Sequence, residues 1–311
     1  MSVQTGIQEQ QRHVVVGVDG SADNLGALRY AAAEAASLGA TLRLVHVVPD
    51  QTPISPLLPE APVDLTRVGE AVLAKAAARV AALAPDVPTE RCLRHGTRPA
   101  QLTAAGDGAV AIVVGRDDRP LLERLLRGDT ATGVAARATV PVIEVPAGWQ
   151  PDERGRIAVG VKAVGHTAEL LADAFALAQR RQAELLIVHA WKLPSEYDDI
   201  IESRVDLDEW RREGTAELEA LVRDWRTAYP DVRVELRVVH DHAGHALVEA
   251  AREADLVMIA RRQHGVPAAV HLGATARAVL RTAPCPVRVV APADVPPIPS
   301  LVVERRGELA R

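Results

Sequence analysis

Hydrophobic and polar positions follow two periods along this chain, and their alternation predicts a regular succession of strands and helices. Val14–Val18 is an apolar, largely β-branched run of the kind that forms a strand buried on both faces. Between Leu25 and Leu38 the apolar residues recur at helical spacing. The same two patterns predict further strands at Thr41–Val48, Thr89–Arg94, Ala109–Gly115 and Pro141–Val145, and helices at Val63–Leu83, Pro99–Gly106 and Thr130–Arg137.

The complete pattern occurs twice. A shift of 143 residues, which becomes 145 after a two-residue insertion, aligns the stretch from Val14 with a second one from Ile157. The second copy predicts strands near Ile157, Leu185, Arg233, Leu256 and Val287. The aligned pairs include Gly17 and Gly160, His46 and His189, His95 and His240, Gly128 and Gly273, and Pro141 and Pro286. Each copy is longer than the repeats of about 20 to 50 residues that stack in solenoids, so each should carry its own core.

Two tandem domains are therefore expected, at residues 12–147 and 155–292, with terminal extensions at 1–11 and 294–311. They meet near the polar segment from Gly148 to Arg156. Strands that alternate with helices form a parallel sheet with helices on both faces and right-handed crossovers. We expect an α/β protein of two tandem three-layer α/β/α sandwiches, each built on a five-stranded parallel sheet.

Composition and charge narrow the function classes. The chain has 48% hydrophobic residues, 25% charged residues and a net charge of -5, which is typical of a soluble globular protein. The mildly acidic balance gives no electrostatic attraction to nucleic acid. No apolar run approaches the ~18 residues of a membrane span, and the N-terminus lacks the apolar core of a signal peptide. We expect a cytoplasmic protein with no nucleic-acid or membrane partner.

Cysteine and repeated histidine residues indicate structural roles. Cys92 and Cys285 do not align between the copies and form no CxxC motif, so isolated thiols are expected. His46 and His189 recur inside apolar strands, which favours a structural hydrogen-bond partner over a catalytic base.

Two polar clusters of the second copy have a structural and a functional interpretation. The first comprises His240, Asp241, His242 and His245. Spacing places no third or fourth metal ligand beside its histidines, so solvated loop histidines are favoured over a metal site. The second is the acidic segment Glu196–Glu213, which is favoured as a solvated helix face over a surface for a basic protein partner. No metal is predicted.

Open α/β proteins bind ligands at the carboxyl ends of strands where the strand order reverses, and two loops of the first copy have sequences suited to such a place. The first strand is followed by Asp19, Gly20 and Ser21. The fourth ends at Gly115, and Gly128 precedes a predicted helix. Glycine at a helix N-terminus lets backbone amides approach a phosphate, and the helix dipole favours the anion. This pattern indicates a crevice suited to a phosphate group.

At these residues the chain resembles the universal stress protein family in its tandem form, over roughly Arg12 to Pro292. ATP-binding members of that family carry the motif G-x2-G-x9-G-[ST] after strand four and an Asp at the end of strand one that contacts adenine. The resemblance implies the strand order 3-2-1-4-5 in each domain, with the two domains related by a pseudo-two-fold axis. The loops after strands one and four would then face each other across one crevice.

The motif of the first copy is only partly kept. Gly115 and Gly128 stand at its first and third glycine positions, but Asp118 replaces the second glycine and Asp129 replaces the hydroxyl residue. Unit like charges ~4 Å apart repel by roughly 4 kcal/mol at an effective dielectric constant of about 20, which weakens phosphate binding. Magnesium and the four arginines between positions 116 and 127 would offset part of this repulsion. Asp129 also suits the N-cap of the following helix, and we favour that role.

The second copy keeps less of the motif. The corresponding residues are Ala260, Gln263, Gly273 and Ala274, and Lys162 replaces the Asp of the first strand. The loop length is the same in both copies, so the fold is kept while the chemistry of the site is relaxed.

Two functions stay open. The first is a non-catalytic stress-response regulatory protein with degenerate ATP-binding motifs in both domains, which acts through protein contacts. The second is a nucleotide-responsive switch that binds ATP in domain one alone. No enzyme is expected, because no nucleophile–base pair, glycosidase-like carboxylate pair or P-loop lysine motif is visible. No cofactor is firmly predicted, and the candidate ATP-binding residues are Asp19, Val47, Gly115, Asp118, Gly128, Asp129 and Thr130.

The fifth strand of each copy is short and flanked by proline, at Pro141–Pro146 and Pro286–Pro292. The family resemblance implies that these strands pair with each other within the chain, which removes two exposed sheet edges. Glu144 and Arg288 stand at nearly equivalent places of the two copies, one residue out of register, which would allow a cross-strand ion pair worth little if exposed. A homodimer and an unidentified protein partner also remain open.

Overall fold

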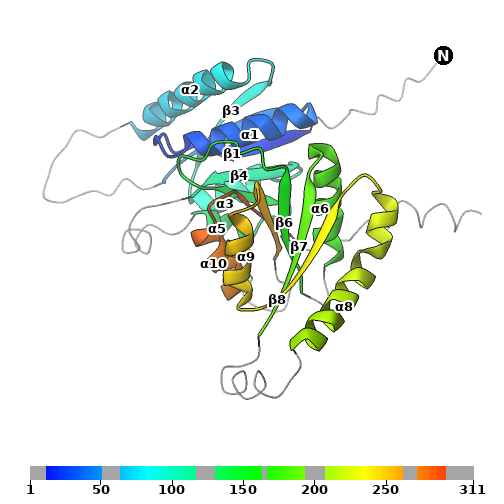
Figure 1. The fold of residues 1–311 in the computed structure, drawn as a ribbon. Coiled ribbons are helices and arrows are strands. Elements are labelled where there is room, and N and C mark those ends of the chain that lie inside the picture. The colour runs from blue at the N-terminus through cyan, green and yellow to red at the C-terminus, as the bar shows by residue number, and fades with distance from the viewer. Residues whose placement is uncertain are drawn as a thin grey trace, which may run out of the picture.

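The computed structural model of the chain describes residues 12–50, 64–116, 130–162, 167–192, 207–261 and 272–291. Over these residues ten strands form one continuous sheet, in the order β3-β2-β1-β4-β5-β10-β9-β6-β7-β8. Figure 1 shows the strands in the middle of the molecule with helices on both sides of them.

Each half of the chain contributes five of these strands. The strands of the first half are β1 (His13–Gly17), β2 (Thr41–Val48), β3 (Thr89–His95), β4 (Ala111–Gly115) and β5 (Val142–Val145). Its helices are α1 (Leu25–Leu38), α2 (Leu65–Leu83), α3 (Arg98–Ala105) and α5 (Thr130–Ala135). The predicted start of the second helix, at Val63, was two residues early, because Asp64 is its N-cap and accepts a hydrogen bond from the backbone N–H of Arg67 at 3.1 Å.

The second half repeats the order of elements. Its strands are β6 (Arg156–Gly160), β7 (Glu184–Trp191), β8 (Val234–His240), β9 (Leu256–Ala260) and β10 (Val287–Val290). Its helices are α6 (Ala168–Arg181), α8 (Leu207–Ala228), α9 (Ala243–Ala251) and α10 (Ala274–Thr282).

The two five-stranded sheets that were expected form one continuous ten-stranded sheet over the described residues. Strand β5 lies antiparallel to β10, while the neighbouring strands within each half are parallel. Antiparallel pairing at the junction joins the edge of one five-stranded sheet to the edge of the other. The strand order reverses at β1 and β4 in the first half and at β6 and β9 in the second.

Each face of the sheet carries one cluster of buried hydrophobic residues, and both clusters continue across the junction between the halves. Helices α1, α2, α6 and α8 cover one face of the sheet, and α3, α5, α9 and α10 cover the other (Figure 1). Leu28 of α1 and Phe175 of α6 belong to the same cluster of buried residues on the first face. Ile112 of β4 and Ile259 of β9 share the cluster on the second face. The two halves therefore share a buried hydrophobic cluster on each face of the sheet.

The suggested ion pair between Glu144 and Arg288 does not form. In the register of β5 and β10, Arg288 lies opposite Ile143, whereas Glu144 lies opposite Val287. Adjacent positions of a strand point to opposite faces of the sheet, so the two charged side chains are separated by the sheet itself. Arg288 pairs with Asp173 and Glu34 instead, and Glu144 pairs with Arg116.

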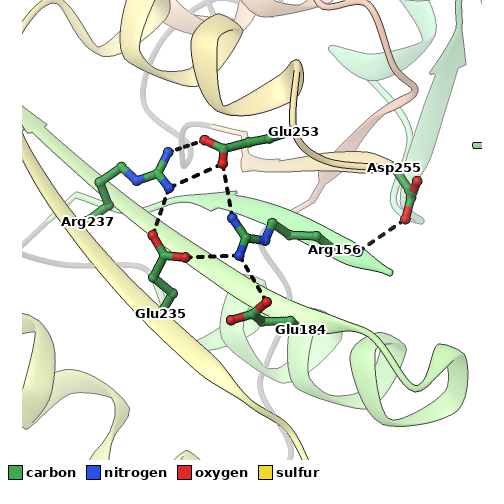
Figure 2. Close-up of polar contacts among 6 residues, drawn as sticks. All are labelled: Arg156, Glu184, Glu235, Arg237, Glu253 and Asp255. Atoms are coloured by element: carbon green, nitrogen blue, oxygen red, sulfur yellow. Dashed lines mark hydrogen bonds and ion pairs between the residues drawn. The ribbon is translucent and has the colours of Figure 1, made fainter. Parts of the chain in front are cut away.

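A network of charged residues ties together the amino-terminal end of the sheet in the second half. Figure 2 shows Arg156 among three carboxylates, those of Glu184, Glu235 and Glu253, at 3.0, 3.1 and 3.0 Å. Arg237 pairs with Glu235 at 2.7 Å and with Glu253, and its hydrogen bond is the main cause of the lowered pKa of Glu253. These contacts link β6, β7, β8 and the end of α9, so we assign them a structural role.

Among the helices that the structure describes, none is both long and apolar enough to cross a membrane.

Candidate functional site

A cavity of about 340 Å³ opens at the carboxyl ends of β1, β2 and β4, where the strand order of the first half reverses. Crevices at such reversal points are the usual ligand sites of open α/β sheets. The lining residues come from the strand ends, from the segment between β1 and α1, and from α3 and α5. They are Gly17, Val18, Asp19, Ser21, Asp23, Asn24, Val45, Val47, Arg98, Leu102, Val114, Gly115, Arg116, Thr130 and Ala131.

Asp19 is oriented by a tight turn directly after β1. Its Oδ1 accepts hydrogen bonds from the backbone N–H of Ser21 at 2.9 Å and from the Ser21 hydroxyl at 2.8 Å. Gly20 between them has a φ of 84°, a conformation that other residues adopt only with strain. One carboxylate oxygen is therefore committed to the turn, while the exposed side chain of Asp19 stands at the cavity.

Apolar side chains form part of the cavity wall, and four of them come from Val45, Val47, Leu102 and Val114. All four are buried. An apolar wall beside a few polar groups is the common composition of small-molecule sites, where the wall contacts a ring and the polar groups fix its orientation.

His46 lies next to this wall but has a structural role, as its sequence context predicted. Its Nδ1 is 2.6 Å from the carbonyl oxygen of Val18, and Nδ1 of His189 is 3.2 Å from the equivalent carbonyl of Val161. Each histidine thereby ties the end of its second strand to the residue that follows its first strand.

Asn24 is a cavity residue that the sequence analysis missed. It is 5% exposed, and its Nδ2 donates to the carbonyl oxygen of Gly17 at 3.0 Å. Its Oδ1 is buried and has no hydrogen-bond partner among the described residues. A buried acceptor without a partner is unfavourable, so a ligand donor or a water at this point would be stabilised. The available signal was an amide residue just before the first helix.

Arg98 and Thr130 complete the polar part of the lining. Arg98 is the first residue of α3 and places an exposed guanidinium beside the cavity. Sequence analysis missed it, although a cation directly after the third strand was visible. Thr130, one of the predicted residues, is the first residue of α5 and is partly buried.

Arg116 follows Gly115 and connects the cavity to the junction between the halves. Its Nε lies 3.2 Å from Oε1 of Glu144, and its Nη1 donates to the carbonyl oxygen of Ala283 in the second half at 2.8 Å. The side chain is only 9% exposed, so this cation is largely neutralised by Glu144. The guanidinium of Arg116, next to Gly115 in the sequence, is therefore already paired with a carboxylate of the protein.

The second half carries different residues at the equivalent positions. Lys162 stands in place of Asp19, Ala260 in place of Gly115, Ala243 in place of Arg98 and Thr167 in place of Asn24. The buried Thr167 hydroxyl donates to the carbonyl oxygen of Lys162 at 3.3 Å. The groups that make the first cavity polar and acidic are therefore absent from the equivalent described positions of the second half.

Four of the predicted site residues, Asp19, Val47, Gly115 and Thr130, line this one cavity. The other three, Asp118, Gly128 and Asp129, lie outside the described residues, and so does Gln263 of the second half.

The histidine cluster of the second half is only partly solvated. His245 on α9 is exposed, and its Nδ1 lies 2.5 Å from Oδ2 of Asp241. His240 is partly buried instead, because its ring stacks on Trp191 with the centroids 4.2 Å apart. Within the described part of the chain, no group of three or more His, Cys, Asp or Glu residues could hold a metal ion.

Both cysteines are free thiols, as expected. Cys285 is buried, and this burial raises the pKa of its thiol to about 12. A thiol with so high a pKa is a poor nucleophile near neutral pH.

The fold and the cavity define a class of protein. Two five-stranded α/β units share one sheet, and the first has a ligand-sized crevice at its strand-order reversal. A family model described as the universal stress protein family matches residues 11–146 and 153–291. The chain belongs to this family and contains two copies of its domain.

Relatives and solved structures agree with this assignment. A universal stress protein of Mycolicibacterium smegmatis is 30% identical over 294 residues, which cover 90% of this chain and 97% of that protein. Universal stress protein Rv2005c of Mycobacterium tuberculosis is 29% identical over 289 residues, covering 90% of this chain and 97% of that protein. A crystal structure of a universal stress protein from Archaeoglobus fulgidus superposes with a TM-score of 0.67 at 18% identity, covering 91% of this chain and 97% of that one.

Proposed function

We propose that the chain is a non-catalytic regulatory protein of the stress response whose first half binds an adenine nucleotide and whose second half does not. The observation that carries this proposal is the cavity of about 340 Å³ in the first half. Its volume falls in the range of about 300 to 1,000 Å³ that is usual for small-molecule sites.

The lining suits the nucleoside part of such a ligand. Val45 and Val47 offer an apolar surface to a planar ring, and Asp19 and the unpartnered Oδ1 of Asn24 accept hydrogen bonds. An adenine amino group and ribose hydroxyls are donors of the kind that these acceptors require. Arg98 supplies a cation for a phosphate.

Catalysis is left out of the proposal for a chemical reason. The described lining contains Ser21 and Thr130 as hydroxyl residues, but it includes no histidine or lysine that would activate one of them. A bound nucleotide would then act by its presence, which changes the stability of the half that holds it.

Matched substitutions in the two halves test the proposal. Asp19→Ala should weaken Mg-ATP binding at least about tenfold, since it removes a hydrogen-bonding carboxylate. Lys162→Ala, at the equivalent position, should leave the affinity within about twofold of the wild type. Equal effects of both substitutions, measured by isothermal titration, would contradict binding in the first half alone.

A second candidate function is a scaffold that acts through protein contacts without nucleotide. It is favoured by the engagement of Arg116 with Glu144 and by the aspartates at positions 118 and 129. Asp118→Gly together with Asp129→Ser restores the family motif and separates the two candidates. If the wild type does not bind Mg-ATP and the double variant does, the scaffold is supported. If the wild type binds measurably and the double variant binds only modestly more tightly, the nucleotide switch is supported.

A further inference from the structure

The junction between the halves contains a buried ion network on the face covered by α1 and α6. Glu34 of α1 is 2% exposed. Its carboxylate accepts hydrogen bonds from Arg180 at 2.8 Å and from Arg181 at 2.7 Å, both on α6. Nη1 of Arg288 on β10 approaches the same carboxylate at 3.8 Å. One buried acid of the first half thus meets three arginines of the second half.

Two further contacts hold these arginines in place. Arg288 is 3% exposed and pairs with Asp173 of α6 through two parallel hydrogen bonds of 2.6 and 2.9 Å. Arg181 donates to the Tyr30 hydroxyl at 2.8 Å, and its guanidinium carbon lies 5.3 Å from the centre of the Tyr30 ring. Paired hydrogen bonds and ring stacking fix a guanidinium more rigidly than a single contact does.

The network keeps Glu34 ionised although it is buried. Burial by itself raises the pKa of this carboxyl, but the charges of Arg181, Arg288 and Arg180 outweigh burial and hold the pKa below its ordinary value. A buried carboxylate in this state depends on the arginines that surround it.

The charged residues of this network have no charged counterparts that could form the same contacts at the equivalent positions of the other half. Ile143 and Arg288, which are equivalent in sequence, lie opposite each other in the β5–β10 pair, so the pseudo-two-fold axis passes between them. The first half has no arginine at the positions of the network, and the second half has no acid at the position of Glu34. The equivalent pairs are Glu34 and Leu177, Ser37 and Arg180, Leu38 and Arg181, Tyr30 and Asp173, and Ile143 and Arg288.

We propose that this surface is a heterotypic lock, through which the first half pairs only with a surface that carries arginines at the positions of Arg180, Arg181 and Arg288. Within this protein the second half alone meets that requirement, so two first halves do not pair through their fifth strands. The two halves of the chain are therefore not interchangeable partners.

Electrostatics excludes both homotypic arrangements. Two first halves in the same geometry would bury two Glu34 carboxylates against Ser37, Leu38 and Ile143, with no cation to compensate them. In a pair of two second halves each Arg288 would keep its own Asp173 but lie beside a second Arg288. Arg180 and Arg181 would face Leu177 and would have lost the carboxylate of Glu34. Specificity thus has two sources: the favourable ion pairs between a first and a second half, and the unfavourable buried charges in a pair of identical halves.

The test uses the full chain with a protease site placed in the exposed segment 150–155 between the halves. Isotopically labelled and unlabelled protein are cleaved, mixed in mild denaturant to permit exchange, returned to native buffer and weighed by native mass spectrometry. Pairs of one first and one second half with mixed labels show that exchange has occurred. We expect homotypic pairs to be below about 1% of the total, since an uncompensated buried charge lowers an association constant by at least about a hundredfold. Homotypic pairs in statistical proportion would overturn the proposal.

A symmetrised variant provides the converse test. Glu34→Leu together with Arg288→Ile gives each half the residue that its counterpart carries, and pairs of two first halves should then appear after cleavage and exchange. Arg43→Gln is the control, because it removes a partly exposed ion pair with Glu90 on β3, away from the junction, and should retain heterotypic pairing. Strict heterotypic pairing in the folded symmetrised variant would also overturn the proposal. If that variant does not fold, the exchange experiment on the wild-type sequence decides.

Discussion

Arg116 and Arg261 occupy equivalent positions after β4 and β9, and each reaches across the junction to an equivalent carbonyl of the other half. Nη1 of Arg116 donates to the carbonyl oxygen of Ala283, and Nη1 of Arg261 donates to that of Ala138, both at 2.8 Å. The two arginines differ in their other contacts, and Nη1 of Arg261 also donates to the carbonyl oxygen of Ala135 at 3.3 Å. Arg116 also pairs with Glu144, whereas the residue equivalent to Glu144 in the second half is Val289.

This difference predicts unequal effects of substitution. Arg116→Gln should lower the free energy of unfolding by about 3 kcal/mol, because it removes the cation that pairs with the buried Glu144. Arg261→Gln should lower the free energy of unfolding by only about 1 kcal/mol. It removes hydrogen bonds to carbonyl oxygens, but it also removes a charged group whose burial is unfavourable, as the lowered pKa of this guanidinium indicates. Urea unfolding of both variants measures the difference, and equal losses would contradict this assignment of roles.

The lock at Glu34 predicts a pH-dependent stability. Glu34→Gln should lower the free energy of unfolding by about 3 kcal/mol near neutral pH, because three arginines lose their shared carboxylate. The pKa of Glu34 is lower in the folded chain than its ordinary value of 4.5. Its contribution is therefore present above pH 4.5 and is lost as the pH falls through the folded pKa. Unfolding curves from pH 7 to about pH 3 should show the wild type and the variant converging; a constant difference would contradict an ionised Glu34.

Helices α1 and α6 end in the same left-handed conformation with different residues. Gly39 has a φ of 57°, and the equivalent Gln182 has a φ of 52°. Gln182→Gly should raise the free energy of unfolding by about 1 kcal/mol, since glycine adopts this conformation without steric cost. The reverse change, Gly39→Gln, should lower it by about as much. Thermal and urea unfolding check both changes, and a loss of stability in Gln182→Gly would show that the glutamine side chain matters more than its backbone.

His245 and Asp241 form an exposed pair whose titration can be observed directly. The hydrogen bond to Asp241, followed by the charge of that carboxylate, raises the pKa of His245. Any stabilisation from this pair is present while Asp241 is ionised and His245 is protonated, and it is lost as the pH rises through the raised pKa of His245. Nuclear magnetic resonance titration of the His245 ring should show the pKa falling toward its ordinary value in Asp241→Asn. An unchanged titration would place the two side chains apart in solution.

Much of the fold could be predicted because local patterns determine it. The run from Val14 to Val16 is buried on both faces of the sheet, as a strand beneath two helix layers requires. Helix α1 and strand β2 have the predicted bounds, because Gly39 ends the helix sharply between two apolar segments. The repeat extended these predictions to the second half.

The arrangement at the junction could not be predicted from either copy alone. The β5–β10 register puts Glu144 and Arg288 on opposite faces, and a register is decided by packing between segments that are far apart in sequence. Asn24 and Arg98 were missed in the cavity for a similar reason. They meet there because α1 and α3 begin near the same strand edge, which no local spacing reveals.

The central claim is that the first half alone binds an adenine nucleotide, and isothermal titration of nucleotide-stripped protein with Mg-ATP tests it most directly. We predict one site per chain with a Kd below about 100 µM, and loss of that binding in Asp19→Ala. Mass spectrometry of any ligand released on denaturation identifies what the purified protein carried. No heat of binding and no released ligand, or two equal sites per chain, would contradict the claim.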